Sequence, residues 1–600
     1  MIKLTSNLIS CFFRHNWVSR CIDARFAIFW VLFASSLAVL RNLGHTAIHY
    51  WDEGFHAIVA RNLLKHPLTF TLYDQPWLPY DYKGWGANHI WLHKPPLAMW
   101  KIAFSYWTLG VNTFALRLPS AILATIAIWI TYRIATDLFD RRAGIIAAFL
   151  QGFNPFLFGS IHGYNYSDHI DIALLFWVEV SCWLLIQAIR GDALRLHVLC
   201  GIAQGLAYLS KSYLALITFG IAIAVWGAKR TKMLNLQDGR IRIYDIAVQL
   251  LSAILTVIPW VAYCLIKHPK EYIWEHKRVL DHLSTDVESW GATWDRPIFD
   301  YMIQFYPVIY TVVIGAVLCL VLCLVLTTFK NRSFGEFFIV AWVVGVIVPH
   351  SFALTKTPSA TMIVTPAMVI CISVIISRSW RKNDWIYTAS WFALTLSTVI
   401  IKGGKSLVKG RDQFDKLNKL APYLETNFWI IKQFLMFGIV LGGLFLCHRL
   451  THRFRWQKWV WFFLRFSVLG ISIFYAKGYI DSSTTVTNRN VNHPLYQAIG
   501  EKIRTDFPDN ACFFLDHSDY GTHFYLMFYA DRSVYQTTTR DAKQQIVDRD
   551  LRKLAKQVQD AGGIPYLVSI TGKDHNYDLV FEARVENAIG RTYQIYKLKE

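Results

Sequence analysis

Long apolar runs separated by short polar segments fill residues 1–476 of the 600-residue chain. Most of these runs are close to the roughly 20 residues that an α-helix needs to cross a bilayer. We therefore predict an α-helical polytopic membrane protein with about thirteen transmembrane helices. The runs cover residues 26–43, 117–136, 143–161, 169–189, 197–210, 213–228, 243–266, 303–328, 335–353, 359–377, 385–401, 428–447 and 459–476.

Basic residues orient these runs, because Lys and Arg concentrate in the cytoplasmic loops of membrane proteins. Arg14, Arg20 and Arg25 precede the first run, which predicts a cytoplasmic N-terminus. The run has no small-residue cleavage site, so we interpret it as a retained anchor. Two long segments are then expected outside, a first outer loop over residues 44–116 and a second over residues 267–302.

The apolar segment 96–111 is open to two interpretations. It is short, begins with Pro95-Pro96 and contains Lys101, so it is either a further span or a helix along the outer interface. The basic pair Arg141-Arg142 reaches the cytoplasm only if this segment does not cross. We therefore predict an interfacial helix.

Residues 477–600 differ from the rest, with many charges and few long apolar runs. Because the last apolar run ends outside, this tail is predicted to be extracytoplasmic. Its pattern indicates a small α/β domain with an accessory or docking role. Short strands are expected at 512–515, 524–529, 566–570 and 593–598, and helices near 494–505 and 541–560.

Composition agrees with a membrane protein, since 54% of the residues are hydrophobic and only 17% are charged. The formal net charge of +20 would suit a nucleic-acid partner, but the basic residues lie in short loops between spans. That distribution reflects topology, so the predicted partner is the lipid bilayer and not nucleic acid. Most of the ten cysteines lie inside apolar runs, which argues against a disulfide framework.

Acids and bases gather on the predicted outer side. A carboxylate there can take a proton from an attacking hydroxyl, and Lys or Arg can neutralise a departing phosphate. Each residue also has a simpler interpretation: Asp52 could cap a helix, Lys211 could end a hairpin and Lys356 could reach along the interface to water. The outer charges are Asp52, Glu53, His93, Lys94, Asp168, Asp171, Lys211, Glu275, His276, Lys277, Arg278 and Lys356.

Two motifs in the first outer loop carry a family resemblance. Trp51-Asp52-Glu53, followed by His93-Lys94-Pro95-Pro96-Leu97, resembles the protein O-mannosyltransferase-like GT-C glycosyltransferases, and within them the aminoarabinose transferases of lipid A. The resemblance covers roughly residues 20–380. Four further stretches match it: Phe114-Ala-Leu-Arg-Leu-Pro-Ser120, Asp140-Arg-Arg-Ala-Gly144, Leu209-Ser-Lys211 and Lys356-Thr-Pro358.

The resemblance implies a GT-C fold and the inverting transfer of a sugar from a polyprenyl-phosphate carrier to an envelope lipid, lipid A or glycan. The carrier would be undecaprenyl phosphate in a bacterial inner (plasma) membrane, or dolichyl phosphate otherwise. The resemblance also assigns roles. Catalytic residues would be Asp52, Glu53 and Asp168; donor-phosphate ligands would be Lys94, Lys211, Arg278 and Lys356; a divalent metal ion (Zn²⁺, or Mg²⁺ or Mn²⁺) would bind His276 and His93.

The chain departs from the family pattern in two places. His93 stands where related enzymes often carry an acid beside the lysine, and Ser359-Ala360-Thr361 replaces an expected aromatic residue. A protein O-mannosyltransferase with a protein acceptor therefore stays open as an alternative. A transporter or flippase of lipid-linked substrates is the alternative from another class, but the chain has no duplicated half and its charges avoid the membrane midplane. A non-enzymatic sensor with an outer domain is the remaining possibility.

Overall fold

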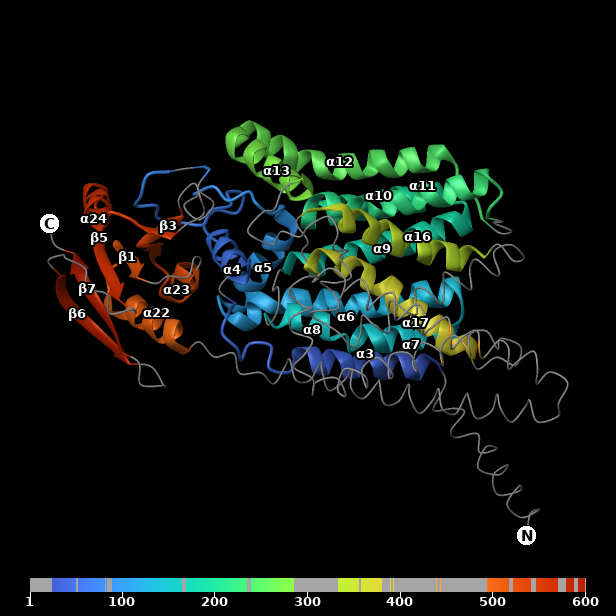
Figure 1. Cartoon of the computed structure of the whole chain (residues 1–600), viewed down its shortest axis with the longest axis horizontal. Coiled ribbons are helices and arrows are strands. Elements are labelled where there is room, and N and C mark those ends of the chain that lie inside the picture. Colours follow the sequence, from blue (N-terminus) through green and yellow to red (C-terminus); the bar gives the residue numbers. More distant parts are fainter. Residues whose placement is uncertain are drawn as a thin grey trace, which may run out of the picture.

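The computed structural model divides into a bundle of long helices and a mixed α/β unit, with two short helices, α4 and α5, between them (Figure 1). We call the bundle end nearest the α/β unit the domain-facing end, and the other the far end. The structure describes residues 24–49, 52–80, 82–83, 89–163, 169–234, 239–284, 333–354, 358–379, 389, 392, 439, 443, 494–516, 522–540, 546–569, 579–586 and 592–598.

Six helical segments of the described residues are long and apolar enough to cross a membrane, or seven if α7 and α8 form one span bent by 42°. The protein is thus a multi-pass membrane protein. The predicted spans 303–328, 385–401, 428–447 and 459–476 lie outside the described residues, apart from single positions. The described part of the bundle consists of α3 (Ala24–Leu40), α6 (Thr113–Leu138), α7 (Arg141–Gly152), α8 (Pro155–Ile161), α9 (His169–Gly191), α10 (Leu194–Lys211), η1 (Ser212–Leu216), α11 (Ile217–Arg230), α12 (Ile243–Lys267), α16 (Phe334–Phe352), η2 (Pro358–Val364) and α17 (Thr365–Ser379).

The helical run Leu194–Arg230 reverses direction near Ser212, which has a positive φ of 59°. Both arms contact the same point on α9: Cys200 Sγ donates to the Ser181 carbonyl at 3.3 Å, and Thr218 Oγ1 lies 2.7 Å from Ser181 Oγ. The run is therefore a hairpin, as the sequence predicts, and Lys211 lies at its tip.

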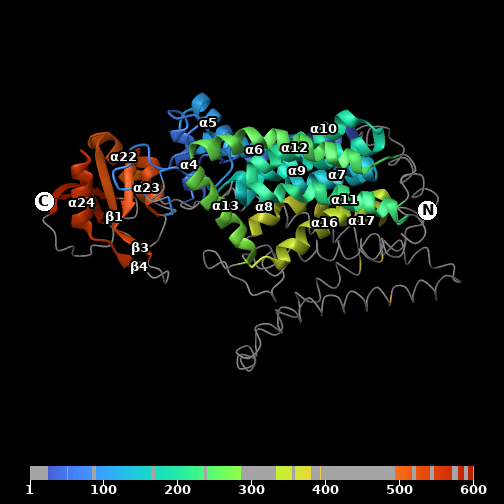
Figure 2. The ribbon, with the colours of Figure 1, turned by 90° about the horizontal axis from the view of Figure 1, so that it is seen from above.

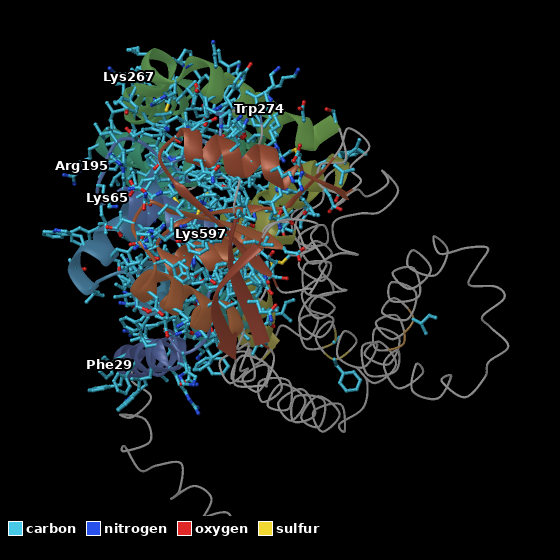
Figure 3. All side chains as sticks on the ribbon, turned by 90° about the vertical axis from the view of Figure 1, so that its left-hand side faces the viewer. Phe29, Lys65, Arg195, Lys267, Trp274 and Lys597 are labelled. Atoms are coloured by element: carbon cyan, nitrogen blue, oxygen red, sulfur yellow. The ribbon has the colours of Figure 1, made fainter. Side chains whose placement is uncertain are left out.

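The outward surface of the bundle is apolar. Phe26, Phe29 and Trp30 of α3 are more than half exposed, and Figure 3 shows Phe29 at the lower edge of the molecule. Large contiguous apolar surface of this kind is unsuited to water and suits lipid chains.

A long connection joins α3 to α6 across the domain-facing end of the bundle. It holds α4 (Asp52–Asn62) and α5 (Pro96–Leu109). Pro96 begins α5, where a missing N–H costs nothing, and Gly110, with a φ of 77°, ends it. Asn112 then caps α6 by accepting from the Ala115 N–H at 2.8 Å. The predicted helix at 96–111 is thus separate from the long helix after it.

The C-terminal unit is a five-stranded sheet in the order β2-β1-β5-β7-β6, with a separate two-stranded sheet of β3 and β4. β1 pairs in parallel with β2 and β5, and β7 pairs antiparallel with β5 and β6. The elements are α22 (Pro494–Asp506), β1 (Ala511–Asp516), α23 (Thr522–Ala530), β2 (Ser533–Gln536), β3 (Thr538–Arg540), β4 (Ile546–Asp548), α24 (Leu551–Asp560), β5 (Ile564–Ser569), β6 (Leu579–Glu586) and β7 (Thr592–Leu598).

The predicted strand at 524–529 is wrong, because these residues form helix α23. A short, uninterrupted apolar run has no period that separates a strand from a buried helix, and α23 is buried on nearly every side. The helix expected at 541–560 is shorter, since β4 precedes α24. Residues 541–545 lie outside the described residues.

The α/β unit packs directly on α4. The rings of Phe55 and Phe524 lie 4.2 Å apart, and the Tyr529 hydroxyl accepts a hydrogen bond from the Ile48 N–H at 3.1 Å. Tyr535 stacks on Tyr73 at 4.6 Å. One hydrophobic cluster runs through both parts, so the unit helps to fix where α4 begins.

Candidate active site

Two adjacent acids begin α4 but differ in environment. Asp52, the first residue of the helix, is half-buried, whereas the side chain of Glu53 is fully buried. An acid at a helix N-terminus is favoured by the helix dipole. The structure thus separates the two predicted acids into an accessible one and an enclosed one.

Arg117 of α6 holds the carboxylate of Glu53. Its Nε donates to Oε1 at 2.7 Å and its Nη2 to Oε2 at 3.0 Å, a two-pronged contact that neither partner shares with water. His169 Nε2 lies 3.1 Å from Oε1, and the His49 N–H donates to Oε2 at 2.5 Å. Burial alone would raise the pKa of Glu53, but Arg117 and His169 more than offset it and hold the pKa well below its usual range.

The backbone around this pair leaves no space. Gly163 has a φ of 65°, and a Cβ atom there would lie 2.3 Å from Oε2 of Glu53. Arg117 Nη1 also donates to the Leu43 carbonyl at 3.1 Å and to Thr46 Oγ1 at 2.6 Å. Glu53 and Arg117 therefore fix α4 to the start of α6 and to the end of the α3 region.

His93 is paired with Glu275. Its Nδ1 lies 2.9 Å from Oε2, and their side chains are 10% and 1% exposed. Glu275 belongs to α13 (Pro269–Ser284), so this contact joins the segment before α5 to the segment after α12. Lys94, the next residue, is half-buried beside this contact.

His276 lies on the same helix and has one ring nitrogen without a protein partner among the described residues. Its Nδ1 lies 3.2 Å from the Tyr272 carbonyl, so this nitrogen carries the proton and Nε2 has the lone pair. Burial lowers the pKa of His276, so the imidazole is neutral at pH 7. A neutral imidazole with a free lone pair is the form that binds metal ions.

Lys211, at the hairpin tip, donates from Nζ to Oδ1 of Asp171 at 2.6 Å. Asp171 lies in the first turn of α9 and is 1% exposed, while Lys211 is 17% exposed. The carboxylate holds the ammonium group in one position, and Lys211 stays partly exposed.

These contacts link five segments into a ring at the domain-facing end. Figures 1 and 2 both place α4, α5 and α13 at this end. Each neighbouring pair in the ring is joined by a hydrogen bond, an ion pair, a ring contact or one or two residues of chain. In order, the residues are Glu53, His169, Asp171, Lys211, Tyr213, His276, Glu275, His93, Trp91 and Phe55.

Six of the nine predicted site residues lie on the ring or next to it in the chain: Asp52, Glu53, His93, Lys94, Lys211 and His276. Arg278 is on α13, with its guanidinium 5.6 Å from the ring centre of Trp274. Asp168 and Lys356 lie outside the described residues.

No three His, Cys, Asp or Glu side chains come together as a metal-binding group in the part of the chain that the structure describes. His276 supplies one suitable nitrogen, and His93 is already paired with Glu275. The described residues therefore do not form a complete site for the divalent ion.

Sequence reasoning did not single out Arg117 or His169, and it treated Glu275 only as one of several loop charges. Arg117 had an available signal, because a charged residue near the start of a long apolar helix usually has a specific partner. His169 and Glu275 had none, since their partners are more than 100 residues away in the chain.

The family described as dolichyl-phosphate-mannose-protein mannosyltransferase matches residues 93–266. The undecaprenyl phosphate-alpha-4-amino-4-deoxy-L-arabinose arabinosyl transferase of Pseudomonas aeruginosa is 24% identical over 228 residues, 35% of this chain and 38% of the relative. The corresponding transferase 2 of Proteus mirabilis is 24% identical over 400 residues, 63% of this chain and 66% of the relative. The Pseudomonas match thus spans well under half of that relative.

The crystal structure of ArnT from Cupriavidus metallidurans bound to undecaprenyl phosphate superposes with a TM-score of 0.61 at 16% identity, covering 95% of this chain and 97% of ArnT. The chain has the fold of ArnT. The oligosaccharyltransferase of Archaeoglobus fulgidus is also similar, with a TM-score of 0.53 and 13% identity over 93% of this chain and 70% of that protein. These likenesses confirm the predicted resemblance to the GT-C superfamily.

Proposed function

We propose that the protein is an integral-membrane glycosyltransferase that moves a sugar from a polyprenyl-phosphate carrier to an acceptor on the outer side of the membrane. The observation that carries the proposal is the gathering of an accessible acid, Asp52, with Lys94 and Lys211 around one ring of contacts. The ArnT-like fold supports it, because the similar Cupriavidus protein binds undecaprenyl phosphate. By this proposal the domain-facing end is periplasmic and the N-terminus cytoplasmic.

The reaction would be a direct displacement with inversion. The acceptor oxygen forms a bond to the anomeric carbon of the donor while the bond from that carbon to the phosphate oxygen breaks. The acceptor proton passes to the carboxylate of Asp52. The bonding electrons leave with the lipid phosphate, whose added negative charge is balanced by Lys94 and Lys211.

Glu53 has a positioning role in this scheme. Its two oxygens already accept from Arg117 and the His49 N–H, so its carboxylate is poorly placed to take a proton from an acceptor. It fixes the first turn of α4 and so the direction in which Asp52 projects. Asp168, Arg278 and Lys356 remain proposed members of the site.

A divalent ion bound by His276 also remains a proposal, and no step above depends on it. The neutral ring with an unpartnered Nε2 supports one ligand. Metal analysis of the purified protein tests it, and an absence of bound Zn²⁺, Mg²⁺ or Mn²⁺ would remove it.

Mass spectrometry of envelope lipids, glycans and proteins, with and without the gene, tests the function. Loss of the gene should remove one sugar modification and raise the level of its polyprenyl-phosphate-linked sugar. If the lost modification is mannose on protein, the acceptor class changes to that of a protein O-mannosyltransferase. Unchanged lipids, glycans and proteins, without accumulated lipid-linked sugar, would contradict the proposal.

A further inference from the structure

A polar cavity of about 190 Å³ lies between the α3–α6 connection and the α/β unit. At roughly 30 Å³ for each water in the liquid, this is the space of about six waters and suits one sugar ring. Figure 3 looks onto this end of the molecule, where Lys65 lies beside the ribbon of the α/β unit. Its charged lining is Arg61, Lys65 and Asp74 from the connection, with Asp509, Asp531 and Arg532 from the unit.

The charges of the lining cancel. Arg61 Nη1 lies 3.0 Å from Asp531 Oδ1, Lys65 Nζ lies 2.5 Å from Asp74, and Arg532 Nη2 lies 2.6 Å from Asp509. A phosphate or carboxylate would meet three carboxylates here, and a cation would meet three basic groups. A neutral hydroxyl suits both kinds of wall, because it donates to carboxylates and accepts from guanidinium or ammonium groups.

The two walls are held together before any ligand binds. Arg61 Nη1 donates to the carbonyls of Met527 and Phe528 at 3.3 and 3.1 Å, and Ser533 Oγ donates to the Gln75 carbonyl at 2.5 Å. The Arg61 side chain is only 13% exposed. The cavity is therefore pre-formed, as small-molecule sites usually are.

The cavity is connected to the proposed active site by α4. Asp52 begins this helix and Arg61 lies in its last turn, so at about 1.5 Å per residue they are roughly 13 Å apart along the axis. The donor sugar reacts beside Asp52 and cannot also fill a cavity at that distance. An acceptor glycan of one or two further sugar rings can span it.

We propose that this cavity binds a neutral, polyhydroxylated part of the acceptor glycan, beyond the hydroxyl that Asp52 activates. The inference rests on the proposed function and names its acceptor as a glycan-bearing molecule. The connection and the α/β unit would then recognise the acceptor together, which gives the unit a role in substrate selection.

The test is saturation-transfer NMR on the full chain in lipid nanodiscs, which contain no sugar detergent. The probes are a neutral methyl hexoside, glucose 6-phosphate and glucosamine. The double variant Lys65→Ala with Asp74→Ala removes one lining pair without changing net charge. The control Lys502→Ala with Asp506→Ala removes a Lys–Asp pair of 2.7 Å on α22, whose two residues do not line the cavity.

Wild type and control should saturate the neutral hexoside more strongly than either charged probe. In the cavity variant the hexoside signal should be at least fivefold weaker than in wild type. Lys65 is 64% exposed, so the cavity variant should keep its melting temperature. No hexoside signal in wild type, stronger signals from glucose 6-phosphate or glucosamine, or an equal loss in the control would each overturn the inference.

The Asp52→Asn variant separates this inference from the proposed function. It should bind the hexoside like wild type, since Asp52 is far from the cavity. Normal donor turnover in Asp52→Asn with intact hexoside binding would count against the proposed base alone. Lost turnover with no hexoside binding in any form of the protein would count against the cavity alone.

Discussion

The two ends of the helical bundle both carry Arg–Glu pairs, but only one end encloses both partners of its pair. At the domain-facing end, Arg117 and Glu53 are each 0% exposed. At the far end, Arg378 and Glu336 lie 2.5 Å apart with 21% and 4% exposure, beside a contact of 3.0 Å between Ser377 and Asp140. At the far end Arg378 reaches water and Glu336 is buried, whereas at the domain-facing end neither partner reaches water.

The difference shows that, among the described residues, the fold buries a complete ion pair, at a cost in desolvation free energy, only at the domain-facing end. Removing charges from water costs several kcal/mol per ion, and only good geometry and added hydrogen bonds recover it. Arg117 and Glu53 recover it through contacts with the Leu43 carbonyl, Thr46 and His169. Such a cost is expected where the position of a neighbouring group matters, and here that group is Asp52.

The largest effect should follow from opening the enclosed pair. Arg117→Met leaves the Glu53 carboxylate buried without its main partner, which typically costs about 3–5 kcal/mol. We expect a large fall in melting temperature, which tryptophan fluorescence measures, and faster proteolysis near α4. Arg378→Met is the matched change at the far end and should cost less, because the Arg378 side chain is 21% exposed and water can partly replace it beside Glu336. Equal losses in the two variants would remove the distinction between the ends.

A smaller effect, on catalysis and not on folding, is expected at Lys94. Lys94→Met removes a charge that balances the leaving phosphate, a loss of about 3 kcal/mol or a hundredfold in donor turnover. Its melting temperature should stay near that of wild type, because the side chain is half-buried and outside the core clusters. Lys229→Met in the last turn of α11 is the control at the far end. Similar turnover in the two variants would contradict the assignment.

The smallest effect concerns Lys101 of α5. Burial lowers the pKa of Lys101 to about 7, and its Nζ has no partner among the described residues. Since the folded pKa lies below the unfolded value near 10.4, the unfolded chain binds more protons between these values and stability rises with pH there.

Lys101→Met should therefore stabilise the protein at pH 7, and the gain should shrink towards pH 10. A pKa shift of this size corresponds to a change of several kcal/mol at most in the free energy of unfolding. Because the stem of the side chain is partly exposed, we expect Lys101→Met to stabilise the protein by about 1–2 kcal/mol at pH 7. Melting temperatures of wild type and variant between pH 6 and 10 test this. A gain that is constant over this range would mean that Lys101 is charged in the folded protein.

Much of the bundle could be predicted because its signals are local. Apolar length places α6, α9 and α12 within a few residues, and Asp52 and Lys94 stand in recognisable motifs. The contacts of the site are not local. Arg117 meets Glu53 across 64 residues and His93 meets Glu275 across 182, and no periodicity specifies such pairs.

The α/β unit illustrates a second limit. Strands β1, β5 and β7 agree with short apolar runs bounded by polar residues. Helix α23 does not, because its aromatic run is buried between the sheet and α4 and so lacks a polar face. Packing against another segment decided this structure, and that information was absent from the local sequence.

The central claim is that the accessible acid of α4 is the base and the enclosed acid is not. Asp52→Asn keeps the shape of the side chain while removing its charge. Release of free polyprenyl phosphate from the lipid-linked donor, measured with purified protein in nanodiscs, should fall by about 10²–10⁴-fold with no change in melting temperature. Turnover within about threefold of wild type, far short of the loss expected for a base, would contradict the account and make Asp52 structural.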